Sequence, residues 1–220
     1  DGLRTEVMQQ WHRLETQTDV SEPSQLGDLG RRAVRNDYTP HWHQGSAIVV
    51  SGPIVTRHAQ IIGNYIENAA QGVDMHCDQT LCSNNVVRRA KIGLKATHGS
   101  RNLVLDGNLL SGVDLWGIVL NPGAGSHWAE PAVDDQPARP ANVDGGILIS
   151  NNIITDYGEG HDYWRYGAAH DDLGSSYAIA FLQAQLKTNP PLSDVLVVGN
   201  MVYDETRDAK TKLQPATGRS

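Results

Sequence analysis

The sequence predicts an all-β protein, a right-handed parallel β-helix: a solenoid of short strands with inserted loops. Three observations favour it. Asparagine recurs along the chain, apolar residues alternate on both sides of it, and short Val/Ile/Leu clusters are separated by Asn, Asp and Gly. The 220 residues include 22 glycines and one Phe. This composition indicates one domain built from strands and turns rather than long amphipathic helices.

The repeated asparagine is the clearest signal. It stands at Asn64, Asn85, Asn108, Asn152 and Asn200. Three residues before it stand Ile61, Cys82, Leu105, Ile149 and Val197, and two residues after it stand Ile66, Val87, Leu110, Ile154 and Val202. Alternation around one polar residue predicts two strands that meet at a bend, with Asn at the bend because it tolerates the left-handed region. We expect the stacked amides to hydrogen-bond along the solenoid.

A further strand is expected after each bend. Its inward residues would be Ile48/Val50, Val73/Met75/Cys77, Ile92/Leu94/Ala96, Ile118/Leu120 and Ile179/Phe181. Its outward residues would be Asp74, His76 and Asp78 on one coil, Lys95 and Thr97 on the next, and Val119 and Asn121 on the third. Neighbouring parallel strands lie ~4.8 Å apart. The sequence therefore predicts that His76 and Lys95 are neighbours on one exposed sheet.

We interpret residues 1–220 as a single β-helix domain. Residues 1–44 would form an irregular coil or cap with a short helix over residues 7–14. Residues 45–205 would form the coils, with insertions at 121–146 and 157–176, and residues 206–220 a tail. Unpaired strand edges at the ends of a solenoid predict self-association or a covering segment, and the chain is open to being a fragment of a longer protein.

Charge and composition exclude several classes of partner. Eighteen Lys+Arg against 25 Asp+Glu give a net charge of −7, which disfavours a nucleic-acid partner. No run of 18 apolar residues is present, so we expect no membrane span. The pattern places Cys77 and Cys82 in the core, which favours free thiols over a disulfide.

Candidate site residues gather around the second coil. The candidate catalytic residues are His76, Lys95 and Asp74. A basic stretch and its surroundings supply the candidate substrate-binding residues Arg88, Arg89, Lys91, His98, Arg101, Trp116 and Asn121. In an acidic protein this concentration suits an anionic ligand, and the alternative is a solvated face whose cations pair with Asp74, Asp78 and Asp106.

The segment Gly72-Val73-Asp74-Met75-His76 resembles the Gly-x-Asp-Pro-His motif of mannuronan C5-epimerases and, more loosely, of β-helical (pectin-lyase-like) polysaccharide lyases. The resemblance covers about residues 59–122 and implies that Asp74 and His76 lie in an active groove. Met75 stands where that family has Pro, Gln71 where it has Tyr, and Lys95 where it has an acidic residue. The resemblance implies a secreted, periplasmic or cell-surface protein that takes an anionic polysaccharide or another glycan.

The chemistry of a lyase or C5-epimerase acting on a uronate polysaccharide fits these residues. A cation such as Arg88 would neutralise the carboxylate, His76 or Lys95 would be the base, with Asp74 orienting the imidazole, and His98 or Tyr65 would be the acid. The alternative is a non-catalytic glycan-binding module, such as a spike, adhesin or surface component.

Two other classes fit less well. A glycoside hydrolase needs carboxylates closer than the ~13 Å between positions 74 and 78 on a strand. Loops carry His127-Trp128 and Tyr163-Trp164-Arg165-Tyr166, whose Trp and Tyr rings would stack on sugar rings. The candidate metal ligands in the loops are His161-Asp162 and His170-Asp171-Asp172. Their spacing matches no strong metal motif, so no metal site is predicted, and calcium is left open as a cofactor.

Overall fold

In the computed structural model, residues 46–113, 115–122, 125–158, 177–182 and 188–204 are described. This part of the chain is all-β and contains no helix. It includes no helix long and apolar enough to cross a membrane. The predicted helix over residues 7–14, the cap at 1–44, most of the 157–176 insertion and the tail at 206–220 lie outside the described residues.

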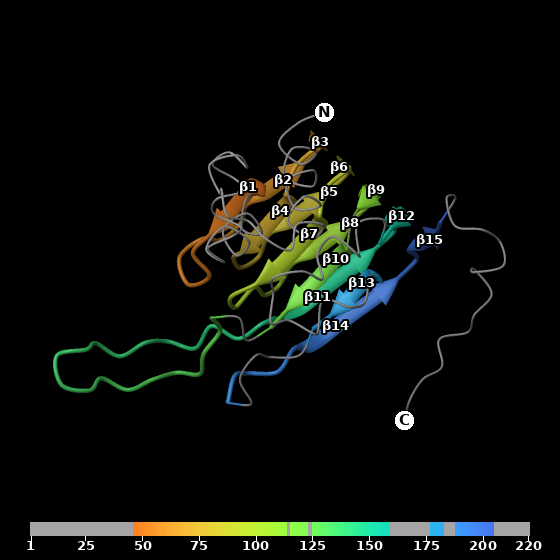
Figure 1. The fold of residues 1–220 in the computed structure, drawn as a ribbon. Coiled ribbons are helices and arrows are strands. Elements are labelled where there is room, and N and C mark those ends of the chain that lie inside the picture. Colours follow the sequence, from red (N-terminus) through yellow and green to blue (C-terminus); the bar gives the residue numbers. More distant parts are fainter. Residues whose placement is uncertain (1–45, 114, 123–124, 159–176, 183–187, 205–220) are drawn as a thin grey trace, which may run out of the picture.

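The strands form three sheets of five parallel strands each (Figure 1). Sheet A contains β1 (Ser46–Ser51), β4 (Gln71–His76), β7 (Ile92–Thr97), β10 (Trp116–Asn121) and β13 (Tyr177–Phe181). Sheet B contains β2 (Gln60–Ile62), β5 (Leu81–Ser83), β8 (Val104–Asp106), β11 (Gly145–Ser150) and β14 (Ser193–Val198). Sheet C contains β3 (Tyr65–Glu67), β6 (Val86–Arg88), β9 (Leu109–Val113), β12 (Ile153–Tyr157) and β15 (Met201–Tyr203).

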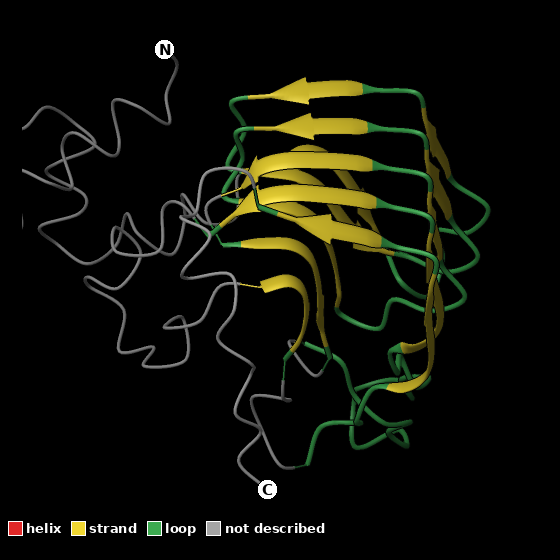
Figure 2. Cartoon of the chain, turned by 90° about the vertical axis from the view of Figure 1, so that its right-hand side faces the viewer, coloured by secondary structure: helices red, strands yellow, loops and turns green. Residues whose placement is uncertain are grey.

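Each coil contributes one strand to each sheet, in the order A, B, C. Every strand pairs in parallel with the corresponding strand of the next coil, so Val73 lies beside Leu94 and Leu94 beside Ile118. Figure 2 shows these strands stacked coil upon coil and joined by turns at the corners. The prediction of an all-β, β-helix-like solenoid is therefore confirmed.

The asparagine ladder is present along the whole described stack. Each side-chain Nδ2 donates to the Oδ1 of the asparagine in the next coil at 2.9 Å, from Asn64 through Asn200. From the second coil on, each Nδ2 also donates to a carbonyl of the coil before, as Asn85 does to Ile61. The amides thereby satisfy one another and nearby backbone carbonyls. A buried donor or acceptor without a hydrogen bond would cost about 1–3 kcal/mol.

The sequence predicts a left-handed backbone conformation at the ladder asparagine. That prediction is wrong, because the residue before the asparagine adopts this conformation. Positive φ angles of 53–69° occur at Gly63, Asn84, Gly107, Asn151 and Gly199. Glycine and asparagine are the residues that adopt this conformation most readily. The turn is thus made by one position, which leaves the next side chain free to point along the ladder.

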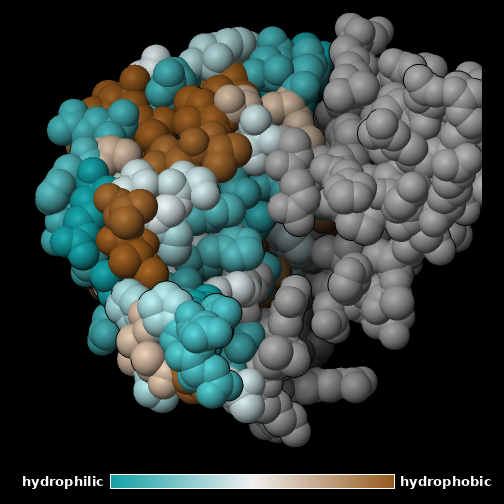
Figure 3. Space-filling model, turned by 90° about the vertical axis from the view of Figure 1, so that its left-hand side faces the viewer, coloured by the Kyte–Doolittle hydropathy of each residue, from teal (hydrophilic) through white to brown (hydrophobic). Residues whose placement is uncertain are grey.

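The core lies between the three sheets. It includes the predicted inward residues of the central coils, among them Val73, Met75 and Leu94. Cys77 and Cys82 are free and fully buried in it, as expected, and burial raises the pKa of Cys82 to about 12. Apolar side chains gather on part of the face drawn in Figure 3. Exposed apolar residues of the first coil include Val49, Ile54 and Val55.

The sequence predicts that Phe181 points into the core, but the structure leaves this residue 51% exposed. Phe181 pairs with buried Leu120, but β13 is the last strand of sheet A among the described residues, so no further described strand of that sheet covers it. Val197 and Val202 are 42% and 43% exposed for the same reason, at the last strands of sheets B and C.

A column of glycines crosses sheet A where its strands bend toward the core. A Cβ on Gly72 would lie 2.7 Å from Val87 Cγ1, and one on Gly117 would lie 2.6 Å from Ile154 Cγ2. The same atoms would lie 2.4–2.6 Å from a backbone carbonyl oxygen of the next coil at Gly72, Gly93 and Gly117. These positions therefore require a residue without a side chain.

Candidate functional site

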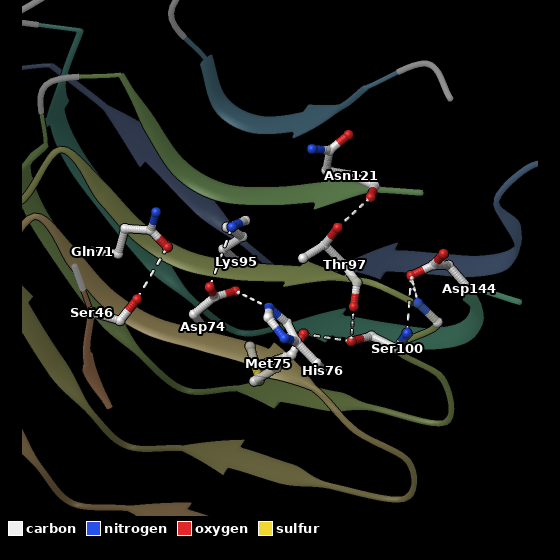
Figure 4. Close-up of polar contacts among 11 residues, drawn as sticks. Ser46, Gln71, Asp74, Met75, His76, Lys95, Thr97, Ser100, Asn121 and Asp144 are labelled. Carbon is white, nitrogen blue, oxygen red and sulfur yellow. Dashed lines mark hydrogen bonds and ion pairs between the residues drawn. The ribbon is translucent and has the colours of Figure 1, made fainter. Parts of the chain in front are cut away.

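The strongest polar constellation lies on the outward side of sheet A, around Asp74 of β4. His76 Nε2 lies 3.0 Å from Asp74 Oδ1, and Lys95 Nζ donates to Asp74 Oδ2 at 3.3 Å. Lys95 is the register partner of Asp74 on β7. Figure 4 shows the lysine and the imidazole approaching the same carboxylate. The predicted proximity of His76 and Lys95 is thus present, with Asp74 between them.

This part of sheet A is not the exposed face that the sequence predicts. The side chains of Asp74, Lys95 and His76 are only 4%, 11% and 17% exposed. Val119, the next residue in the Asp74–Lys95 row, is 1% exposed although it is outside the core cluster. Alternation correctly assigned the side of the sheet, but it carries no information about what covers that side.

Charge complementarity determines the ionisation of Asp74. Burial alone would raise the pKa of this carboxyl group, but the hydrogen bond from His76 and the positive charge of Lys95 outweigh it. The pKa is therefore lowered and the carboxylate stays ionised at neutral pH. A buried carboxylate of this kind orients an imidazole and stabilises positive charge on it.

A second imidazole, that of His98, completes the constellation. The ring centroids of His76 and His98 are 4.4 Å apart, with the planes tilted by 55°. Burial lowers the pKa of His98, and the charges of His76 and Lys95 lower it further. His98 is therefore neutral at neutral pH, beside an imidazole that contacts a carboxylate.

The turn that carries His98 is held by groups that the sequence did not reveal. Ser100 Oγ donates to the carbonyls of Met75 and Thr97, and Asp144 Oδ1 accepts hydrogen bonds from the backbone N–H groups of Gly99 and Ser100 at 3.0 and 2.9 Å. Asp144 and Ser100 are both buried. Asp144 lies 44 residues beyond Ser100, and no spacing signal marks it.

Several predicted residues lie on other parts of the solenoid. Arg88 is an exposed residue at the end of β6 in sheet C. Arg89 pairs with Glu67, which also accepts a hydrogen bond from the Tyr65 hydroxyl. These interactions place Arg88, Arg89 and Tyr65 at sheet C rather than beside Asp74. Their substrate-binding and acid roles stay predictions.

The remaining candidates are engaged elsewhere or buried. Arg101 Nε donates to Asp78 Oδ2 at 3.1 Å. Lys91 is 4% exposed, and burial, with the nearby charge of Lys95, holds the pKa of its ammonium well below the ordinary value. Trp116 is 5% exposed. Asn121 is half-buried at the end of β10, where its carbonyl accepts a hydrogen bond from Thr97 Oγ1 at 2.7 Å.

Gln71, which stands where the epimerase motif has Tyr, is buried and accepts a hydrogen bond from Ser46 Oγ at 3.2 Å. Within the described ranges, no group of three or more His, Cys, Asp or Glu side chains is arranged to hold a metal ion.

Comparisons of the chain with protein-family models, with curated proteins and with solved structures find no match. The assignment of function therefore rests on the site itself.

Proposed function

We propose that this protein is a right-handed, pectin-lyase-like β-helix that acts on a uronate-containing polysaccharide as a lyase or C5-epimerase, with Asp74, His76, Lys95 and His98 as its reacting groups. The observation that carries the proposal is the contact of one buried carboxylate with an imidazole and an ammonium group. Right-handed crossovers are the rule for parallel strands. The resemblance of the Gly72–His76 segment supports the substrate class and a secreted, periplasmic or cell-surface location.

The geometry favours His76 as the base. Nε2 of His76 faces Asp74, so Nδ1 is the nitrogen that takes the C5 proton. Asp74 stabilises the resulting imidazolium, and Lys95 balances the charge that develops on the uronate carboxylate. In a lyase, the C5–H electron pair forms the C4=C5 bond, the C4–O4 bond breaks, and the proton passes to O4. In an epimerase, C5 takes a solvent-derived proton on the opposite face.

His98 has a role separate from that of the base. Because its pKa is lowered, His98 keeps one N–H and one free ring nitrogen at neutral pH. We assign it the hydrogen bond to the O4 substituent in a lyase. In an epimerase, the 4.4 Å between the two imidazoles leaves no room for a sugar ring between them, so the opposite-face proton comes from solvent. The lower exposure of Lys95 than of His76 favours Lys95 as a fixed cation over Lys95 as the base.

The test uses alginate, pectate and hyaluronan. We expect either an increase in ultraviolet absorbance from unsaturated uronate or exchange of the C5 proton with D2O, measured by NMR. His76→Gln should abolish that signal and change the free energy of unfolding by no more than about 1 kcal/mol. His58→Gln is the matched control, because His58 is exposed outside this constellation and a glutamine, Gln79, already has the same left-handed backbone conformation in the next coil.

The second candidate is a non-catalytic glycan-binding module, which the low exposure of Asp74 favours. In that case we expect the protein to bind one or more of the three polysaccharides without an increase in ultraviolet absorbance and without exchange of the C5 proton. Full turnover by His76→Gln would remove His76 from the mechanism, and equal loss in His58→Gln would show that the effect is not specific to the site.

A further inference from the structure

A hairpin arm leaves the solenoid beside the site. β10 ends at Asn121 and β11 begins at Gly145, and the intervening chain projects away from the sheets (Figure 1, green). Its two legs pair through the backbone of Glu130 with Arg139 and of Val133 with Gln136. Every residue from 128 to 140 is exposed. Because the arm buries none of these side chains, its placement depends on its base.

The base is attached to the turn that carries His98. Asn142 Nδ2 donates to the carbonyl of His98 at 3.5 Å, and Asn142 Oδ1 accepts a hydrogen bond from the backbone N–H of His127. Asp144, which holds the 99–100 backbone, also accepts from Ser126 Oγ. Gly125 packs so closely that a Cβ there would lie 2.2 Å from His98 Nδ1. Both legs of the arm are thus anchored beside His98.

Trp128 is the first residue beyond this base. Its side chain is 54% exposed, whereas Trp116 is 5% exposed. Its backbone is held in place, because His127 Nδ1 lies 2.8 Å from the Trp128 carbonyl oxygen and Glu130, two residues along the same leg, pairs with Arg139 of the other leg. An indole offers a flat apolar face, and presenting it from a fixed backbone reduces the entropy cost of binding.

The carboxyl ends of successive strands of sheet A lie between His76 and this arm. His76, Thr97 and Asn121 end three successive strands of sheet A, and the arm follows directly on Asn121. Two strand spacings amount to roughly 10 Å. A polysaccharide bound across the carboxyl ends of these strands would run from His76 toward the base of the arm.

We infer that Trp128 is a sugar-binding subsite, which stacks on a ring of the polysaccharide outside the uronate that reacts at His76. The inference rests on the proposed function and extends it to substrate length. The charges of the arm support contact near its base: Asp134 and Asp135 lie at the tip, where they repel a polyanion, whereas Glu130 is paired with Arg139 at 2.9 Å.

The test measures binding by calorimetry in the His76→Gln protein, which keeps the ligand intact. The probes are uronate oligosaccharides of two and eight units prepared from alginate, pectate and hyaluronan. Trp128→Ala is compared with Trp128→Phe, which keeps an aromatic face, and with Val133→Ala, which removes a 59% exposed side chain from the same arm.

We expect Trp128→Ala to weaken binding of the eight-unit ligand at least ten-fold and to leave the two-unit ligand unchanged. Trp128→Phe should retain most of the affinity, and Val133→Ala should bind as the parent does. If Trp128→Ala binds the eight-unit ligand with the affinity of the parent, the subsite proposal is wrong. The proposed function would still stand if an enzyme with Trp128→Ala as its only change exchanges the C5 proton or cleaves the polysaccharide. If no oligosaccharide binds and neither signal is found, both proposals fail.

Discussion

At the scale of single residues, the ladder asparagines connect the sequence repeat to stability. Asn108 is fully buried, and its amide joins the coils on both sides: Oδ1 accepts from the backbone and side chain of Asn85, and Nδ2 donates to Cys82 and Asn152. Removing one such amide leaves donors and acceptors of two neighbouring coils unpaired. An unpaired buried group costs about 1–3 kcal/mol.

We predict that Asn108→Ala lowers the free energy of unfolding by at least about 2 kcal/mol, measured by urea denaturation. Asn200→Ala is the matched control at the last coil, where Asn200 is half-buried and water can replace the lost amide. Its cost should be less than half as large. Equal costs at both positions would contradict the ladder as a source of stability in the stack.

His98 makes the free energy of unfolding depend on pH. The pKa of His98 is lowered from 6.5, so the unfolded chain binds a proton more readily than the folded protein does. The stability that His98 contributes is present above pH 6.5 and is lost as the pH falls through that value toward the folded pKa.

We expect the free energy of unfolding of the wild-type protein to fall between pH 7 and pH 5 more steeply than that of His98→Gln. The difference should not exceed about 1.4 kcal/mol per pH unit. The measurement is a urea titration at both pH values. Parallel slopes for the two proteins would show that His98 is not held neutral by its surroundings.

At the scale of elements, the period-2 pattern predicted the strands well, because inward side chains of successive coils share one core. It made no prediction for Gly72, Gly93 and Gly117, which lie within β4, β7 and β10 where a Cβ would clash with the core or with the next coil. A sequence pattern of apolar residues cannot detect such positions, since the required feature is the absence of a side chain.

We predict that Gly93→Ala destabilises the protein by about 2–3 kcal/mol, because its Cβ would lie 2.4 Å from the Gly117 carbonyl oxygen and 3.3 Å from Leu110 Cδ1. Gly63→Ala is the control, since a Cβ there meets nothing within 4 Å and carries only the cost of its φ of 69°. That cost is about 1 kcal/mol. Thermal unfolding compares the two, and a larger loss for Gly63→Ala would contradict the close approach at Gly93.

At the scale of the whole molecule, the sequence predicted which coils stack and that Asp74, His76 and Lys95 come together. These residues lie in the regular coils, where a period of about 21–25 residues brings side chains into one row. The sequence did not predict the burial of that row, because alternation gives the side of a sheet and not its exposure. It did not predict the role of Asp144 either, because no residue type or spacing distinguishes this carboxylate from other polar residues of the turns. It also grouped Arg88 and Arg89 with Lys95, although a corner of the solenoid separates sheet C from sheet A.

The central claim is that successive coils stack in register, and a disulfide test addresses it most directly. Glu67 of β3 and Arg88 of β6 are register partners, so paired cysteines at these positions lie within disulfide reach. Cysteines at Tyr65 and Arg88 are offset by two residues, or roughly 8 Å, which is too far. The native thiols are buried and do not compete.

Under mild oxidation, the Glu67→Cys/Arg88→Cys protein should lose the mass of two hydrogen atoms in the folded state and regain it with reductant. The Tyr65→Cys/Arg88→Cys protein should stay reduced under the same conditions. Cross-linking of the offset pair in preference to the register pair would contradict the stacking on which the site and both functional proposals depend.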